Sequence, residues 1–342
     1  MRDDVPMDSA AVVKRFGLGG DVCAWLEEAG ALPEPARALD VPVGERAERV
    51  LDLFALEPVD RAEVGELWPD GRWPLELWHL VECMYRRLCA DAGLAAGEWR
   101  SWPSLVEAED PRVRVASLWA FAAMVEAQFE RHAEWGIDPS VTAATLADVG
   151  VQVARARRMF GRLSLELAEW VATQFRGRLF RVGGLQVEPA VLGEQGEVEW
   201  YAPGQARALG AGMAVGDPCL RLHVPTGGLD PVGVEGTLAR ARGFARAHLG
   251  IDPVVATCTS WLLDPRWGEV LGGSSNIVRF QRRFALVGEG CAGDADVFRF
   301  VFGLPRVDVS AVARGTRLER AVVERLEAGG GWTVRTGWLA LE

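Results

Sequence analysis

The sequence has few of the residues from which metal sites are built. Its six cysteines form no CxxC pair and none combines with the four histidines at zinc-ligand spacing, so no metal site is expected. It also has no uninterrupted apolar run of about 18 residues, and residues 1–9 contain no apolar signal core. These absences predict a cytoplasmic protein with reduced thiols and no membrane partner.

Positive charge is also in deficit. The chain has 37 basic and 48 acidic residues, a formal net charge of −11, which argues against a nucleic-acid partner. No GKS or GKT triplet is present, so the sequence contains no P-loop. A ligand that carries phosphate would therefore need a local site of another kind.

What is present is the composition of an ordinary globular protein. Of the 342 residues, 49% are hydrophobic and 25% are charged. This length predicts roughly two domains, each large enough to bury its own core. Nothing in the sequence indicates the oligomeric state.

Residues 1 to about 176 show the periodicity of helices. Apolar residues recur at spacings of three and four, and Asp138 followed by Pro139 has the pattern of an N-cap and a first helical residue. The tryptophans concentrated in this half are expected in its core. Helices are predicted from Pro74 through Leu88, after Pro111 through Phe129, from Asp138 through Val153, and from Ser164 to Gly177.

From about Arg178 the pattern changes to short strands separated by turns. Residues 179–188 and 197–201 are predicted to form a hairpin-like pair, and further strands are expected at 219–224, 254–262, 297–302 and 332–341. Helices are expected after Asp230, after Asp264, from Asn276 and over 309–326. The sequence therefore predicts an α/β (α+β) chain, with a helical domain over 1–160 and a mixed-sheet domain over 161–342.

One strand of the second domain ends beside a glycine turn. Between Cys219 and Val224, apolar residues alternate with Arg221 and His223, and the strand is followed by Thr226, Gly227 and Gly228. Backbone amides in such a turn, together with the N-terminus of the next helix, bind phosphate in many proteins. The turn does not follow the GxGxxG fingerprint, and such a sequence taken alone is more often a plain turn than an anion site.

Three side chains of this domain are candidates for chemistry. His223 lies at a strand end, where an imidazole acts as a base, or is simply hydrogen-bonded within a half-buried sheet. Cys258 and Ser260 share one face of the next strand, and beside His223 they would serve as nucleophile or as proton donor to a leaving group. The alternative is that both are small residues fitted where strands pack, because no nucleophile elbow is visible.

A short helix supplies two further candidates. Asn276 begins it, and Arg279 follows with Arg282 and Arg283. Capping and a solvated face explain these residues. If this helix faces the glycine turn, the arginines instead meet the phosphates of a cofactor.

Four blocks of the second half resemble those of the bacterial GNAT-like acyltransferases. In that family a helical N-acyltransferase N-terminal domain precedes a GNAT-like domain, and the resemblance extends over the whole chain. The blocks are residues 177–189 (GRLFRVGGLQVEP), 222–230 (LHVPTGGLD), 258–265 (CTSWLLDP) and 275–284 (SNIVRFQRRF).

The resemblance implies a coenzyme A thioester as co-substrate and a small-molecule acyl acceptor. In the wider superfamily, one strand leads into the loop and helix that hold the coenzyme A pyrophosphate, and the next strand splays away to admit pantetheine. Residues 219–224 and 254–262 match these strands. The resemblance then implies that His223 is the base, that Cys258 or Ser260 assists the leaving thiolate, and that the cofactor is bound by Val224, Thr226, Gly227, Gly228, Asn276 and Arg279.

Two features depart from the family pattern. The usual pyrophosphate loop contains a basic residue and more glycines than PTGGLDPV at 225–232. The usual acid is a tyrosine, but the only tyrosines are Tyr85 and Tyr201, and Phe280 occupies the comparable helix.

The leading hypothesis is acyl transfer from acyl-CoA to an amine or hydroxyl. The alternatives are a non-catalytic module that binds acyl-CoA or a metabolite, and a thioester hydrolase or decarboxylase.

Overall fold

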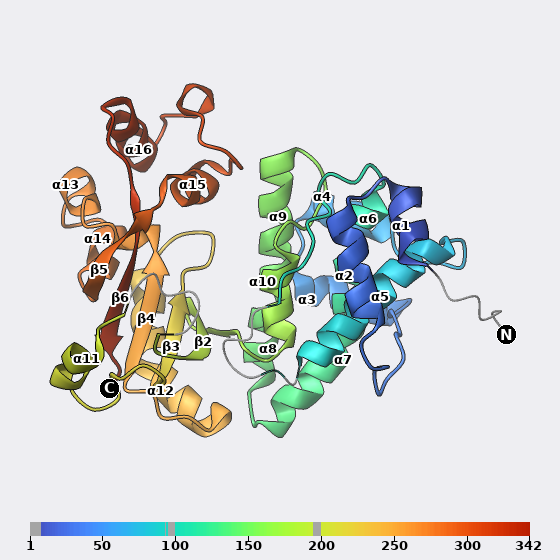
Figure 1. Ribbon diagram of the computed structural model, residues 1–342, viewed down its shortest axis with the longest axis horizontal. Helices are drawn as coiled ribbons and strands as arrows, with labels where there is room; N and C mark the ends of the chain where they lie inside the picture. The colour runs from blue at the N-terminus through green and yellow to red at the C-terminus, as the bar shows by residue number, and fades with distance from the viewer. Residues whose placement is uncertain (1–7, 93, 95–99, 194–199) are drawn as a thin grey trace. The chain divides into compact units, whose positions relative to one another are not determined.

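The computed structural model describes residues 8–92, 94, 100–193 and 200–342 (Figure 1). The chain forms two compact units, Met1–Leu179 and Phe180–Glu342. The boundary between the two units lies further along the sequence than the expected boundary at 160/161. The reason is that α10 (Ala168–Phe175) belongs to the helical core, where its apolar residues are buried.

All the regular secondary structure described in the first unit is helical. The core forms around α5 and α7, and it includes the fully buried Phe121, which stacks on Phe175 with ring centroids 5.1 Å apart. Burying a side chain of this size stabilises the fold by about 1.5–3 kcal/mol. No helix of the described residues is long and apolar enough to cross a membrane. Besides α10, the helices are α1 (Ser9–Phe16), α2 (Gly20–Gly30), α3 (Glu45–Phe54), α4 (Pro58–Glu66), α5 (Leu75–Asp91), α6 (Pro111–Arg114), α7 (Ala116–Glu134), α8 (Pro139–Leu146) and α9 (Asp148–Phe160).

Most predicted helices of this unit are present, with two corrections. The segment after Asp138 forms two helices rather than one, because Asp148 begins α9 and its carboxylate accepts hydrogen bonds from Trp170 and Gln174. Asp138 caps α8 as expected. Ser164 does not cap α10, since its hydroxyl donates to the carbonyl of Arg162 and the helix begins later.

A buried histidine joins two helices of this unit. His132 on α7 is 1% exposed, with Nδ1 2.8 Å from Thr142 Oγ1 and Nε2 2.7 Å from Gln128 Nε2. Gln128 also donates to the carbonyl of Gln174. An amide group can only donate through its nitrogen, so Nε2 accepts and the ring is neutral. Burial, with a smaller contribution from Arg131, lowers the pKa of His132 to about 4.

This histidine makes the stability of the helical unit depend on pH. The folded state binds its proton less readily than the unfolded state, whose histidine pKa is about 6.5, so stability is lost as pH falls from about 6.5 to 4. We expect the loss at pH 4 to be about 3 kcal/mol. Urea unfolding followed at several pH values measures it, and His132→Gln should flatten the dependence. An equal pH dependence in the variant would contradict this assignment.

The second unit is built on one mixed sheet. Its strands are β1 (Phe180–Val182), β2 (Leu185–Val191), β3 (Pro218–His223), β4 (Val255–Ser260), β5 (Ala285–Ala292) and β6 (Thr333–Ala340), in the order β1-β2-β3-β4-β6-β5. Only β3 and β4 pair in parallel among the described strands. The helices are α11 (Pro203–Leu209), α12 (Pro231–Phe244), α13 (Trp267–Leu271), α14 (Asn276–Gln281), α15 (Asp294–Val297) and α16 (Arg317–Glu327).

The mixed sheet is confirmed, but several predicted elements change. The hairpin forms between β1 and β2, within residues 179–191, and most of the predicted partner strand at 197–201 lies outside the described residues. The predicted strand at 297–302 is helical, and the unpredicted β5 precedes it. Over 309–326 a 3-10 turn precedes α16, which begins only at Arg317, where Thr316 and Glu319 form a capping box.

Helix α12 is held against the β1–β2 hairpin by a backbone contact. The amide of Gly184 donates to the carbonyl of Gly233 at 3.0 Å, and a Cβ on Gly184 would lie 2.5 Å from the Gly233 carbonyl carbon. Thr237 on the same helix accepts from the Leu185 amide. Only glycine permits this approach, so the first turn of α12 has a fixed place beside the sheet.

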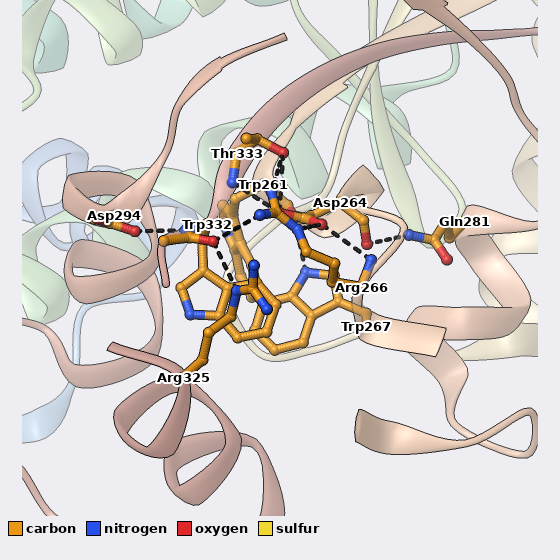
Figure 2. A network of polar contacts seen from close by, with 10 residues as sticks. Trp261, Asp264, Arg266, Trp267, Gln281, Asp294, Arg325, Trp332 and Thr333 are labelled. Atoms are coloured by element: carbon orange, nitrogen blue, oxygen red, sulfur yellow. Dashed lines mark hydrogen bonds and ion pairs between the residues drawn. The ribbon is translucent and has the colours of Figure 1, made fainter. Parts of the chain in front are cut away.

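The end of β4 is anchored to β6 by one buried carboxylate (Figure 2). Asp264 accepts from Arg266 Nε at 2.7 Å, from the Thr333 amide at 2.7 Å and from the Thr333 hydroxyl at 2.9 Å. Beside it, Trp267 stacks on Trp332 with ring centroids 3.6 Å apart. Burial alone would raise the pKa of Asp264, but the hydrogen bonds outweigh it and hold the pKa below its ordinary value.

We expect Asp264→Asn to destabilise the sheet unit by about 3 kcal/mol at pH 7, because breaking a buried, hydrogen-bonded charge pair costs this much. The depressed pKa means that the contribution is present above the unfolded pKa of about 4 and is lost as pH falls below it. Thermal unfolding at pH 7 and at low pH measures both effects. Equal stability of the variant and the natural chain at pH 7 would contradict the anchoring role.

Candidate active site

The two parallel strands β3 and β4 separate before they end. Their pairing covers Leu220 with Ala256 and Arg221 with Thr257, and goes no further. Beyond these pairs each strand keeps only its other neighbour. β3 still pairs with β2, and β4 still pairs with β6 (Figure 1). Past the last pair Leu222 and Cys258 are still buried, and the residues that follow them are partly exposed on both strands: His223, Val224, Thr259 and Ser260.

A histidine and a carboxylate meet on one face of the sheet at this point. His223 Nε2 lies 2.8 Å from Glu188 Oε2, and Arg221 Nη1 lies 3.7 Å from Glu188 Oε1. The side chains of Arg221 and Glu188 are largely buried, and that of His223 is partly exposed. A carboxylate only accepts, so the neutral ring has its proton on Nε2 and its lone pair on Nδ1. Glu188 thereby orients the ring of His223.

Sequence reasoning missed Glu188. It lies on β2, directly opposite Arg221 and two residues along from Gln186, the partner of His223, so it shares their face only because of the β2–β3 register. The alternation in the block LQVE gives the face of Glu188 within its own strand. It does not give the β2–β3 register, because residues 192–217 separate these two strands in the sequence.

Cys258 and Ser260 lie on the face opposite His223. The pairing of Leu220 with Ala256 places Ala256, Cys258 and Ser260 with the apolar side of β3. Cys258 is 2% exposed, and burial raises the pKa of its thiol to about 12, so it stays protonated at neutral pH. The Ser260 hydroxyl accepts from the Leu262 amide at 3.1 Å. The structure therefore does not bring either side chain together with His223.

The turn after β3 offers backbone amides to a ligand. Thr226, Gly227 and Gly228 are exposed, and the two glycines have φ values of 117° and 100°. A Cβ on either glycine would have nothing within 4 Å. The amides of Thr226 and Gly227 make no hydrogen bond within the described chain, and residues 225–228 form a turn.

The N-terminus of α12, in contrast, already has a negative partner. Asp230 caps it by accepting from the Val232 amide at 3.3 Å and from the Gly233 amide at 2.8 Å. Pro231 has no amide hydrogen. The expectation that turn and helix end together bind a phosphate is therefore corrected, since only the turn has amides to offer.

Helix α14 is tied to the same turn. The side-chain amide of Asn276 donates to the carbonyl of Leu229 at 2.9 Å, so Asn276 is not simply a cap. Arg279 lies one turn further along and is exposed, whereas Arg283 pairs with Glu235 of α12. Val224 packs against the apolar cluster that contains Trp261 and Val278. The structure thus places Asn276 beside the turn, and Arg279 lies on the helix that Asn276 ties to it.

Comparisons with known proteins agree with this geometry. The GNAT-like C-terminal domain model matches residues 179–339, and the N-acyltransferase N-terminal domain model matches residues 45–177. No curated protein matches the sequence significantly.

Solved structures of acyltransferases are similar over nearly the whole chain. One holds decanoyl-CoA and teicoplanin, with 30% sequence identity, a TM-score of 0.85, and coverage of 98% of this chain and 100% of the other. Another, a mutant in complex with octanoyl-CoA, has 30% identity, a TM-score of 0.84 and the same coverage. The chain therefore belongs to the acyltransferases in which an N-acyltransferase N-terminal domain precedes a GNAT-like domain.

Proposed function

We propose that this protein transfers a medium-length acyl group from acyl-CoA to an amine or hydroxyl of a small acceptor. The observation that carries the proposal is the His223–Glu188 pair, 2.8 Å apart, at the point where β3 and β4 separate. The proposed length of the acyl group is based on the similar structures, which hold octanoyl-CoA and decanoyl-CoA.

The donor would bind around the turn after β3. The exposed amides of Gly227 and Gly228 would hold the pyrophosphate, and Arg279 would pair with a phosphate of the cofactor. The pantetheine arm would lie where the pairing of β3 and β4 stops, because strand edges there have no ladder partner. Asn276 supports this site by holding the turn through Leu229.

The transfer would then need one proton acceptor. His223 Nδ1 takes a proton from the acceptor nucleophile as that nucleophile attacks the thioester carbonyl carbon. Glu188 stabilises the imidazolium that forms, because its carboxylate accepts from Nε2. Collapse of the tetrahedral intermediate breaks the C–S bond and releases coenzyme A.

The acceptor class is suggested by one relative. An acyltransferase structure at 30% identity holds CoA and 10C-teicoplanin, so glycopeptides with a free amine are the first acceptors to screen. Product masses distinguish the competing hypotheses. An acylated acceptor supports transfer, free fatty acid alone supports a thioester hydrolase, and binding without product supports a non-catalytic module.

We expect His223→Ala to lower kcat about 10²- to 10⁴-fold, because a general base contributes that much. Glu188→Gln should lower it about tenfold to a hundredfold, the worth of a hydrogen bond to a charged group. Mass spectrometry of the acylated acceptor measures both rates. His248→Ala is the control, since this residue belongs to the same unit and contacts Phe244 instead. Unchanged turnover of His223→Ala would remove this residue from the mechanism.

Acyl-CoA affinity should depend on the glycine turn. Gly227→Ala and Gly228→Ala force an alanine into positive φ, which costs about 1–2 kcal/mol, so we expect roughly tenfold weaker binding of CoA and decanoyl-CoA. Titration calorimetry measures the affinity. Gly243→Ala is the matched control, because a Cβ there also has nothing within 4 Å and its φ is not positive. If all three variants bind CoA and decanoyl-CoA as tightly as the natural chain does, the pyrophosphate is bound elsewhere.

A further inference from the structure

A pair of threonine hydroxyls lies on the His223 face of the sheet. Thr259 on β4 is paired with Thr336 on β6, and their hydroxyl oxygens are 2.9 Å apart. Thr259 lies two residues beyond Thr257, the partner of Arg221, so it shares a face with Arg221 and His223. Thr259 is therefore the polar side chain of β4 that faces the same side as His223 beyond the last β3–β4 pair.

The two threonines differ in exposure. Thr336 is 0% exposed, whereas Thr259 is partly exposed at the separation of the strands. Within the described residues the hydroxyl of Thr259 contacts only Thr336. When Thr336 donates to Thr259, the proton of Thr259 is left to donate outward. The buried hydroxyl of Thr336 thus fixes the position of the accessible hydroxyl of Thr259.

Acyl transfer from a thioester produces negative charge that needs such a donor. Of the two tyrosines, Tyr85 lies on α5 of the helical unit, and the hydroxyl of Tyr201 already accepts a hydrogen bond from Trp338 Nε1 at 3.2 Å. Cys258 and Ser260 lie on the opposite face. Resting on the proposed acyl-CoA transfer, we infer that the Thr259 hydroxyl donates a hydrogen bond to the departing coenzyme A sulfur and that Thr336 positions it.

The step balances without proton transfer from threonine. The nucleophile's electron pair forms the new bond to the carbonyl carbon, and its proton goes to His223. The C–S electron pair goes to sulfur, which leaves as a thiolate that accepts the Thr259 hydrogen bond. The thiolate then takes a proton from solvent, and His223 returns its own proton to solvent. A hydroxyl is a weak acid but a good donor, so it stabilises the charge without losing its hydrogen.

The test measures the thiol of bound coenzyme A. Thr259→Val removes the hydroxyl at equal size, so we expect the pKa of the bound CoA thiol to rise by about one unit and kcat to fall about tenfold. Ultraviolet absorbance of the thiolate, followed against pH in the complex, gives this pKa. Thr259→Ser should restore both values. Affinity for desulfo-CoA, which has no sulfur, should be the same in Thr259→Val and the natural chain.

Thr257→Val is the matched control. It lies on the same strand and face, is 1% exposed and has a hydroxyl with no hydrogen-bond partner among the described residues, so its removal should leave the thiol pKa unchanged. Thr336→Val should raise that pKa by less than Thr259→Val, since it only positions the donor.

Two outcomes would overturn the inference, and they are distinguishable. If Thr259→Val binds CoA with an unchanged thiol pKa and unchanged kcat, Thr259 has no such role while acyl transfer stands. If the natural chain binds neither CoA nor decanoyl-CoA, the proposed function fails and the inference fails with it.

Discussion

The sheet unit depends on one buried carboxylate. Asp264 joins the exit of β4 to the start of β6 through its bonds to Arg266 and Thr333, and the stacked Trp267 and Trp332 exclude water from the joint. Because β4 is fixed to β6 here, its last residues keep their strand geometry even though they have separated from β3. The partly exposed end of β4 is thus rigid without a second neighbour.

The candidate site has a supporting strand on each side of the point where β3 and β4 separate. On β3, the pairing with β2 brings Glu188 to His223, and on β4 the pairing with β6 brings Thr336 to Thr259. Each partly exposed polar group is therefore positioned by a more deeply buried partner on the strand outside it. Such support holds a site in place because the ladder, rather than a loop, sets the distances.

The sequence predicts local features of this site and misses those that depend on pairing. The strand that ends at His223 and the cap at Asp230 can be read locally, and both are present. The short apolar run at 297–302 fits a strand or a helix equally, and β5 was missed because a bulge interrupts its alternation. Glu188 and the opposite face of Cys258 follow from register, which no local pattern specifies.

The division of the chain at Leu179 and Phe180 has a consequence for how this protein can diversify. Every residue assigned here to the donor site and to proton transfer lies in the second unit, and each is positioned by neighbours within that unit. The helical unit has a core of its own. Substitutions in one unit can therefore accumulate without disturbing the internal geometry of the other.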